Sequence, residues 1–179
     1  MADNMMVREI GHASSPAWSP RVGRPDSVSW ATQQAEFMEM RSTAKVAQVE
    51  NAIRKPIEQA AWSVEPNGAP TEVVELVSTD LRLPVKGEDG QVARRTGRVS
   101  WDEHLKMALE AVFTGVAFFE QVYELGDDGR HHLRKLAPRP NISVRKIHVA
   151  SDGGLVGITQ RGVKGGKDAF IPVERLVAY

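Results

Sequence analysis

The chain has 179 residues, of which 41% are hydrophobic and 26% are charged, and its 23 basic and 23 acidic side chains give a formal net charge of zero. The length indicates one domain with or without an unstructured arm, and the composition excludes a fibrous or wholly disordered protein. The absence of cysteine excludes a disulfide scaffold, a thiolate metal site and a cysteine nucleophile, and no apolar run approaches the roughly 20 residues that span a bilayer.

Residues 1–28 are expected to form a flexible N-terminal arm, because Gly, Pro and Ser interrupt any apolar period. Trp18 is the exception in this arm, and its indole is a candidate for docking on a neighbouring surface. From Ser29, apolar residues recur at steps of three and four up to Ala60, which predicts a helix with one broad apolar face. Pro56 lies inside this run and lacks an N–H, so we expect it to kink or divide the helix.

The next segment predicts shorter elements. Residues 61–65 alternate as a short strand does, and the sequence Pro-Asn-Gly at 66–68 is typical of a turn. Thr71 begins a second predicted helix that Pro84 closes. Residues 86–98 are expected to form an exposed loop.

A third helix is predicted from Ser100, because Ser100 and Glu103 have the spacing of a capping box. Gly115 is expected to end this helix. Its expected buried face consists of Trp101, Leu105, Ala108, Leu109, Val112 and Phe113.

The remainder of the chain has β character. A strand over 116–125 is followed by a hairpin turn at 127–129, and Gly-rich turns separate the later segments. Further strands are predicted over 131–137, 142–149, 154–160 and 168–177. Helices followed by a mainly antiparallel meander predict an α+β domain over residues 29–179.

The neutral net charge hides an asymmetry. Residues 1–90 carry 9 basic and 13 acidic side chains, whereas residues 91–179 carry 14 and 10. Within 130–167 Asp152 is the one acid, against nine cations: Arg130, Arg134, Lys135, Arg139, Arg145, Lys146, Arg161, Lys164 and Lys167.

Two interpretations of this basic stretch stay open. It is either a nucleic-acid surface that contacts phosphates or a solvated sheet face opposed by acids of residues 1–90 or of a neighbouring subunit. Contacts from six of these cations predict a loss of DNA affinity of roughly 10³ between about 50 and 200 mM salt. Aromatic stacking residues are missing from 130–167, which disfavours a single-strand or RNA module.

Sites for catalysis, metals and cofactors are not predicted. Residues 161–168 lack the first Gly and the hydroxyl of a phosphate loop, so they indicate a hairpin turn. His131 and His132 are adjacent on a strand and point to opposite faces, which disfavours a shared metal ion. Asp127 and Asp128 lack the spacing of a calcium loop, and a hairpin turn is enough to explain them.

Large aromatic residues are expected to anchor the core or an interface. The candidates are Trp62, Trp101, Phe113, Phe118 and Tyr123, and for Trp62 and Trp101 the core is favoured.

Five segments, in order, resemble those of bacteriophage portal proteins. Residues 49–66 resemble the family's helix followed by a W-x-V-x-P strand, and residues 104–124 its helix ending in a G-x-x-x-x-E strand. Residues 133–140 resemble its L-x-x-L-x-P-R segment, and 153–158 and 171–179 two later strands, the second with an I-P motif. Each match alone is weak, whereas the ordered set is fairly specific.

The resemblance implies a non-enzymatic subunit of a ring, usually dodecameric, at one vertex of a tailed-phage capsid. Its implied partners are further copies of itself, the major capsid protein, terminase, head–tail adaptors and, transiently, double-stranded DNA, with no membrane. The matched region corresponds to the N-terminal wing on the outer side of the ring. The implied location is the virion, and the host cytoplasm during assembly.

Family members usually continue well past the last matched strand, so the resemblance implies a chain truncated at its C-terminus, a fragment or one product of a split gene. The alternative function is a stand-alone nucleic-acid-binding module that uses residues 130–167. In a ring, the acidic first half and the basic second half are expected to meet between neighbours, so that high salt loosens the assembly.

Overall fold

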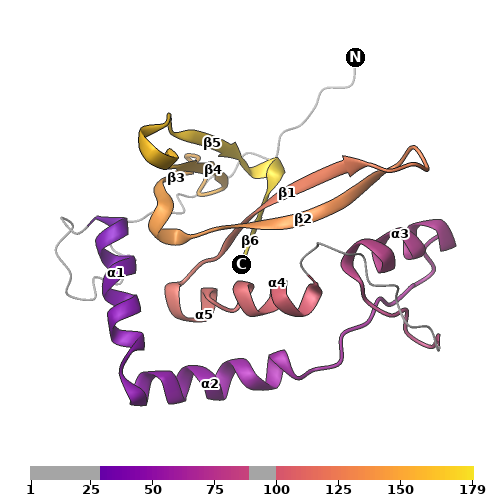
Figure 1. Ribbon diagram of the computed structural model, residues 1–179, viewed down its shortest axis with the longest axis horizontal. Coiled ribbons are helices and arrows are strands. Elements are labelled where there is room, and N and C mark those ends of the chain that lie inside the picture. The colour runs from indigo at the N-terminus through magenta and orange to yellow at the C-terminus, as the bar shows by residue number, and fades with distance from the viewer. Residues whose placement is uncertain (1–28, 89–99) are drawn as a thin grey trace.

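The computed structural model describes residues 29–88 and 100–179, apart from the side chain of Lys164. The expected arm over 1–28 and most of the expected loop over 86–98 lie outside the described residues. Helices come first along the chain and antiparallel strands follow in two small sheets, which confirms the predicted α+β class (Figure 1).

The first predicted helix is two helices, α1 (Trp30–Arg41) and α2 (Ala44–Glu58). Ser29 caps α1 by accepting the N–H of Thr32, and the chain then breaks at Ser42 and Thr43. Ser42 turns its backbone N–H and its hydroxyl back onto the carbonyl of Glu39, which ends the helical ladder. Of the two predicted effects of Pro56, a kink or a division of the helix, the division is not found at Pro56. Pro56 lies in the last turn of α2, where one missing N–H disturbs little of the remaining helix.

The predicted strand at 61–65 is reduced to a single parallel bridge between Val64 and Val85. The predicted turn is confirmed, since Asn67 and Gly68 have positive φ angles of 44° and 78°. Helix α3 (Thr71–Leu81) follows and ends at Arg82, whose left-handed conformation stops the helix before Pro84 is reached.

The third predicted helix begins with the expected capping box between Ser100 and Glu103 but is interrupted near its end. It consists of α4 (Trp101–Ala108) and the short α5 (Ala111–Thr114), and Gly115 ends α5 at a φ of 84°. Within the predicted buried face, Val112 is exposed, which corrects that part of the prediction. No helix of the described ranges has the length and apolar character needed to cross a membrane.

The strands form two three-stranded antiparallel sheets in place of one meander. The first sheet has the order β2-β1-β6 and the second β3-β4-β5. Their bounds are β1 (Phe118–Leu125), β2 (His131–Arg139), β3 (Val144–Val149), β4 (Leu155–Gln160), β5 (Ala169–Pro172) and β6 (Leu176–Ala178). The predicted strand over 168–177 splits at a 3₁₀ turn over 173–175, which moves the chain from the second sheet to the first.

Two adjacent aromatic residues of β1 divide the core, because successive side chains of a strand point to opposite faces. Phe118 packs with Val144, Ile158, Ile171 and Leu176, which come from both sheets. Phe119 points to the other face and packs with Ala108 of α4 and with Ala117. Strand β1 thus holds the helical layer and the second sheet together.

Candidate functional site

The structure distributes the predicted basic stretch over both sheets. Four of its arginines are in ion pairs, and their partners are distributed along the chain. The pairs are Arg130 with Glu72, Arg134 with Glu124, Arg139 with Glu120, and Arg145 with Asp168. Three of the four acids come from the second half of the chain and one from the first.

Four other cations of this stretch are exposed and have no ion pair with a described residue. They are Lys135 on β2, Lys146 on β3, and Arg161 and Lys167 in the loop between β4 and β5. The side chain of Lys164 lies outside the described part of the chain. The eight cations whose side chains are described therefore do not form one continuous row along paired strands.

A cluster of ion pairs, here called the helix clamp, joins α1, α2 and the start of α5. It consists of Arg41, Glu50, Arg54 and Glu110. Arg41 donates to Glu50 at 2.5 and 2.7 Å and to Glu110 at 2.5 Å, and Arg54 reaches the same carboxylates at 2.8 and 3.0 Å. Burial opposes the charge of Glu50, but the hydrogen bonds from Arg54 and Arg41 outweigh it and keep the pKa of Glu50 below its ordinary value.

The helix clamp forms one side of an apolar cavity of about 320 Å³ between α2 and α5, here called the α2–α5 groove. Its lining residues are Lys45, Val46, Val49, Glu50, Ile53, Val112 and Phe113. On helix α2 a charged residue is buried while apolar residues face the solvent. Glu50 is 7% exposed, whereas Val49 is 56% and Ile53 48% exposed. Contiguous exposed apolar side chains of this kind mark surfaces that contact another protein.

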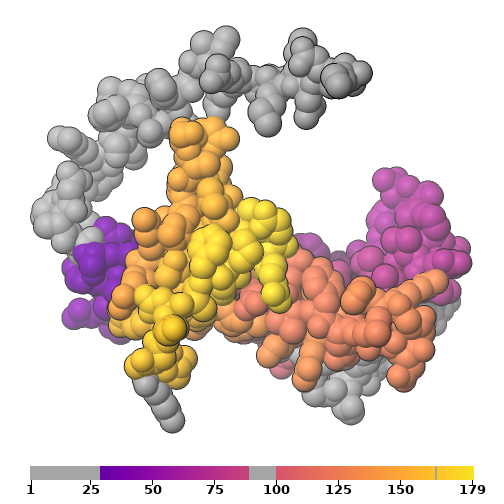
Figure 2. Space-filling model, turned by 90° about the horizontal axis from the view of Figure 1, so that it is seen from above, coloured from indigo at the N-terminus to yellow at the C-terminus, as the bar shows by residue number. Residues whose placement is uncertain are grey.

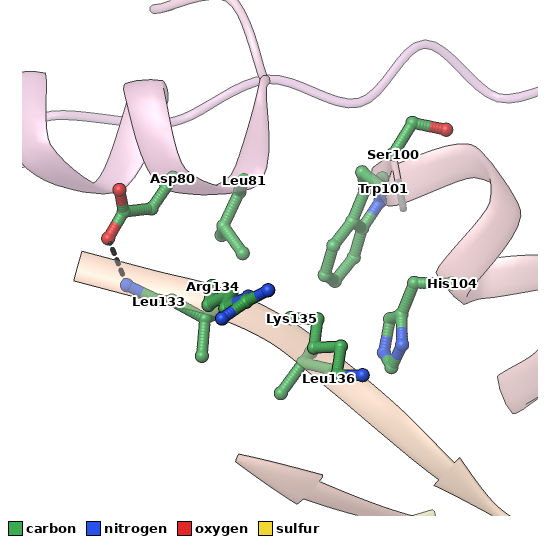
Figure 3. A pocket seen from close by; sticks show the side chains of 9 residues that line it. All are labelled: Asp80, Leu81, Ser100, Trp101, His104, Leu133, Arg134, Lys135 and Leu136. Carbon is green, nitrogen blue, oxygen red and sulfur yellow. Dashed lines mark hydrogen bonds between the residues drawn. The ribbon is translucent and has the colours of Figure 1, made fainter. Parts of the chain in front are cut away.

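At the other end of the molecule, α3 is fixed to the β1–β2 hairpin (Figure 2). Asp80 accepts the backbone N–H of Leu133 at 2.7 Å (Figure 3). The same carboxylate contacts Nδ1 of His132 at 2.8 Å. The other imidazole nitrogen lies 3.1 Å from Asp128. Hydrogen bonds to Asp80 and Asp128 favour the charged imidazole, so the pKa of His132 is raised above 6.5.

A small cavity lies where α3, the start of α4 and β2 meet (Figure 3). Asp80, Trp101 and His104 face it, and its volume is about 20 Å³, room for about one water molecule. It is too small for a substrate. Within the described ranges, no group of three or more His, Asp and Glu residues has the arrangement of a metal site.

The five predicted anchors occupy different environments. Phe118 is buried between the sheets, while Trp101 and Phe113 are half-buried. Trp62 and Tyr123 are exposed, although Trp62 makes an edge contact with Trp101 at 5.9 Å between ring centroids.

Sequence reasoning missed the burial of Glu50 and of Gln34 on α1. Periodicity assigns polar residues to the solvent side of a helix, so neither residue gives a signal of burial. The spacing of Glu50 and Arg54 at i and i+4 could have indicated the ion pair, but not the two partners from α1 and α5.

Comparisons with known proteins agree with the ordered segments of the sequence. The family model of the portal protein of Mu bacteriophage matches residues 34–179, from the second turn of α1 to the end of β6. A search of curated proteins finds no match. Because the family match covers well over half of the chain, it confirms the resemblance to phage portal proteins. The chain belongs to the family of the portal protein of Mu bacteriophage.

Proposed function

We propose that this chain is the wing segment of a portal ring subunit at one vertex of a phage capsid. The family match over residues 34–179 carries this proposal. In it, residues 29–179 form one wing-like α+β unit preceded by an arm over 1–28. The ring is the connector through which DNA is packaged and ejected, and the chain has a structural, non-enzymatic role.

The proposed partners follow from that role. They are neighbouring copies of the chain, the major capsid protein, terminase, head–tail adaptors and DNA in transit. The chain acts in the virion, after assembly in the host cytoplasm. The α2–α5 groove supports the contact between copies, because Val49, Ile53 and Val112 expose apolar surface next to the rigid helix clamp.

The proposal predicts that a charge placed in the α2–α5 groove prevents assembly. Val49→Asp combined with Ile53→Asp should abolish rings in negative-stain images and shift the mass from light scattering toward that of a monomer. Burying two carboxylates without partners costs several kcal/mol at an apolar interface. The two side chains are half exposed in the single chain, so its fold should be retained, which circular dichroism checks.

Val163→Asp is the matched control, because Val163 is 82% exposed and lies in the β4–β5 loop outside the groove. It should leave assembly unchanged. Rings that persist in the Val49/Ile53 variant would remove the groove from the subunit contact. A wild-type chain that stays monomeric at all concentrations would contradict the portal function itself.

A further inference from the structure

A cavity of about 350 Å³ separates α1 from α4, α5 and the end of β2, and it is distinct from the α2–α5 groove. Its apolar walls are Met38, Met107, Phe118, Phe119, Pro138 and Pro140. Met38 and Ile142 line it and are half exposed, so the cavity opens to the surface there. Cavities of this size and apolar lining are typical of binding sites for one bulky group.

Four buried polar atoms of the residues that line this cavity have no hydrogen-bond partner among the described residues, and one of them is Arg139 Nε. The side chain of Gln34 is 1% exposed, and both its Oε1 and Nε2 are unpaired. The Nδ2 of Asn141 donates to Thr114 Oγ1 at 2.9 Å and to the carbonyl of Val116 at 2.6 Å, which leaves Asn141 Oδ1 unpaired. An unpaired buried polar group destabilises the fold, so an occupant that pairs with these atoms is favoured.

An occupant with a large apolar body and an N–H donor can fill the space and pair with one of the two free oxygens, Gln34 Oε1 or Asn141 Oδ1. We propose that the side chain of Trp18 of the same chain occupies this cavity. Tryptophan has the one indole N–H that Gln34 Oε1 or Asn141 Oδ1 can accept, and its ring fills the space between the methionine, phenylalanine and proline walls. The other large apolar residues of the segment, methionine and isoleucine, have no side-chain donor.

The connection to α1 puts Trp18 within reach. Trp30, the first residue of α1, donates its indole N–H to the carbonyl of Asn141 at 2.9 Å, so the chain enters α1 beside the cavity wall. Trp18 precedes Ser29 by eleven residues, which span up to about 36–40 Å when extended. Gln34 lies about 7.5 Å along the helix from Ser29. A tether of this length gives an effective concentration of the order of mM, so a weak contact is populated.

The absence of cysteine from the chain makes a crosslinking test direct. The full chain carrying Ser19→Cys and Ile142→Cys is oxidised under mild conditions, and the disulfide is followed on non-reducing gels and by mass spectrometry. We expect the intramolecular disulfide to form at least about tenfold faster than in a control chain with Ser19→Cys and Leu125→Cys, given the mM effective concentration at a docked site. Leu125 is more exposed than Ile142. It is the last residue of β1, at the end of that strand farther from α1 (Figure 1).

A second series tests the indole itself. Trp18→Ala should slow the disulfide of the Ser19/Ile142 pair severalfold and leave the Ser19/Leu125 pair unchanged, and Trp18→Phe, which keeps the ring but not the donor, should give an intermediate rate for the first pair. Equal rates for both cysteine pairs, or no effect of Trp18→Ala, would overturn the proposal. A disulfide that forms between two chains and not within one would also overturn it, because it assigns the cavity to a second copy. The proposal does not rest on the portal function.

Discussion

Glu50 receives hydrogen bonds from arginines of two helices while its side chain is almost fully removed from water. Such a carboxylate is tolerated because Arg41 and Arg54 neutralise it and occupy its oxygens. Glu110 completes the clamp, so each arginine pairs with both clamp carboxylates, and Arg54 pairs with Glu58 as well. The α1–α2 corner is therefore held against α5 by charge, and the apolar side chains of α2 remain free to face outward.

Glu50→Ala should lower the free energy of unfolding by about 3 kcal/mol, since removal of one partner of a buried ion pair leaves the other charge uncompensated. The loss should lie at the low end of the range found when one partner of a buried ion pair is removed, because Glu110 still neutralises part of the two arginine charges. Urea denaturation measures it. Glu65→Ala is the control, because Glu65 pairs with Lys86 at the surface and should cost less than about 1 kcal/mol. Equal losses in the two variants would contradict a structural role of the clamp.

Individual elements show what the sequence predicts well. The capping box of Ser100, the stop at Gly115 and the hairpin at Gly129 depend on contacts within a few residues, and each lies where the sequence placed it. The arrangement of α1 and α2 against α5 depends instead on the helix clamp, which joins residues 69 positions apart. The division of the last strand into β5 and β6 likewise depends on which sheet each half joins.

The same distinction applies to the candidate surfaces. The exposure of Val49 and Ile53 could not be predicted, because apolar periodicity shows which residues share one face of a helix but not whether another part of the chain covers that face. The ion pairs of Arg139 and Arg145 depend on which strands and loops lie side by side, which charge counting does not reveal. The charge content was therefore predictable, whereas its distribution over two sheets was not.

Helix α3 gives a pH-dependent prediction, because Asp80 and Asp128 raise the pKa of His132. A raised pKa means that charged His132 stabilises the fold below its ordinary pKa of 6.5, and that this contribution is lost as the pH rises through the folded pKa. The melting temperature of the wild type should therefore exceed that of His132→Asn by more at about pH 5.5 than at about pH 8.5.

His131→Asn supplies the control for this comparison, since His131 is exposed at the adjacent position of β2. Its difference from the wild type should change little with pH. A gap between wild type and His132→Asn that is constant over the same pH range would show that the imidazole is not held charged by the two aspartates.

On the scale of the whole molecule, several basic side chains of the second half are neutralised by ion pairs within the same chain. The acidic and basic halves suggested that opposite charges meet between neighbouring subunits, but Arg130, Arg134, Arg139 and Arg145 already have acidic partners in the same chain. Among the cations of the stretch whose side chains the structure describes, which excludes Lys164, four exposed ones have no such partner: Lys135, Lys146, Arg161 and Lys167. The described part of the stretch therefore offers fewer unpaired cations for phosphate contact than the sequence count suggests.

The salt dependence of DNA binding measures this limit. Each phosphate contact contributes about −0.9 to the slope of log affinity against log salt, so contacts from these four cations predict a slope of about −3.6, or a loss of about 150-fold between about 50 and 200 mM. Fluorescence anisotropy with duplex DNA should show this, and Lys135→Gln with Lys146→Gln should flatten the slope by about 2. Arg139→Gln should leave the slope unchanged, because Arg139 is paired with Glu120. A slope near −6, or a clear effect of Arg139→Gln, would mean that the paired arginines leave their carboxylates for phosphate.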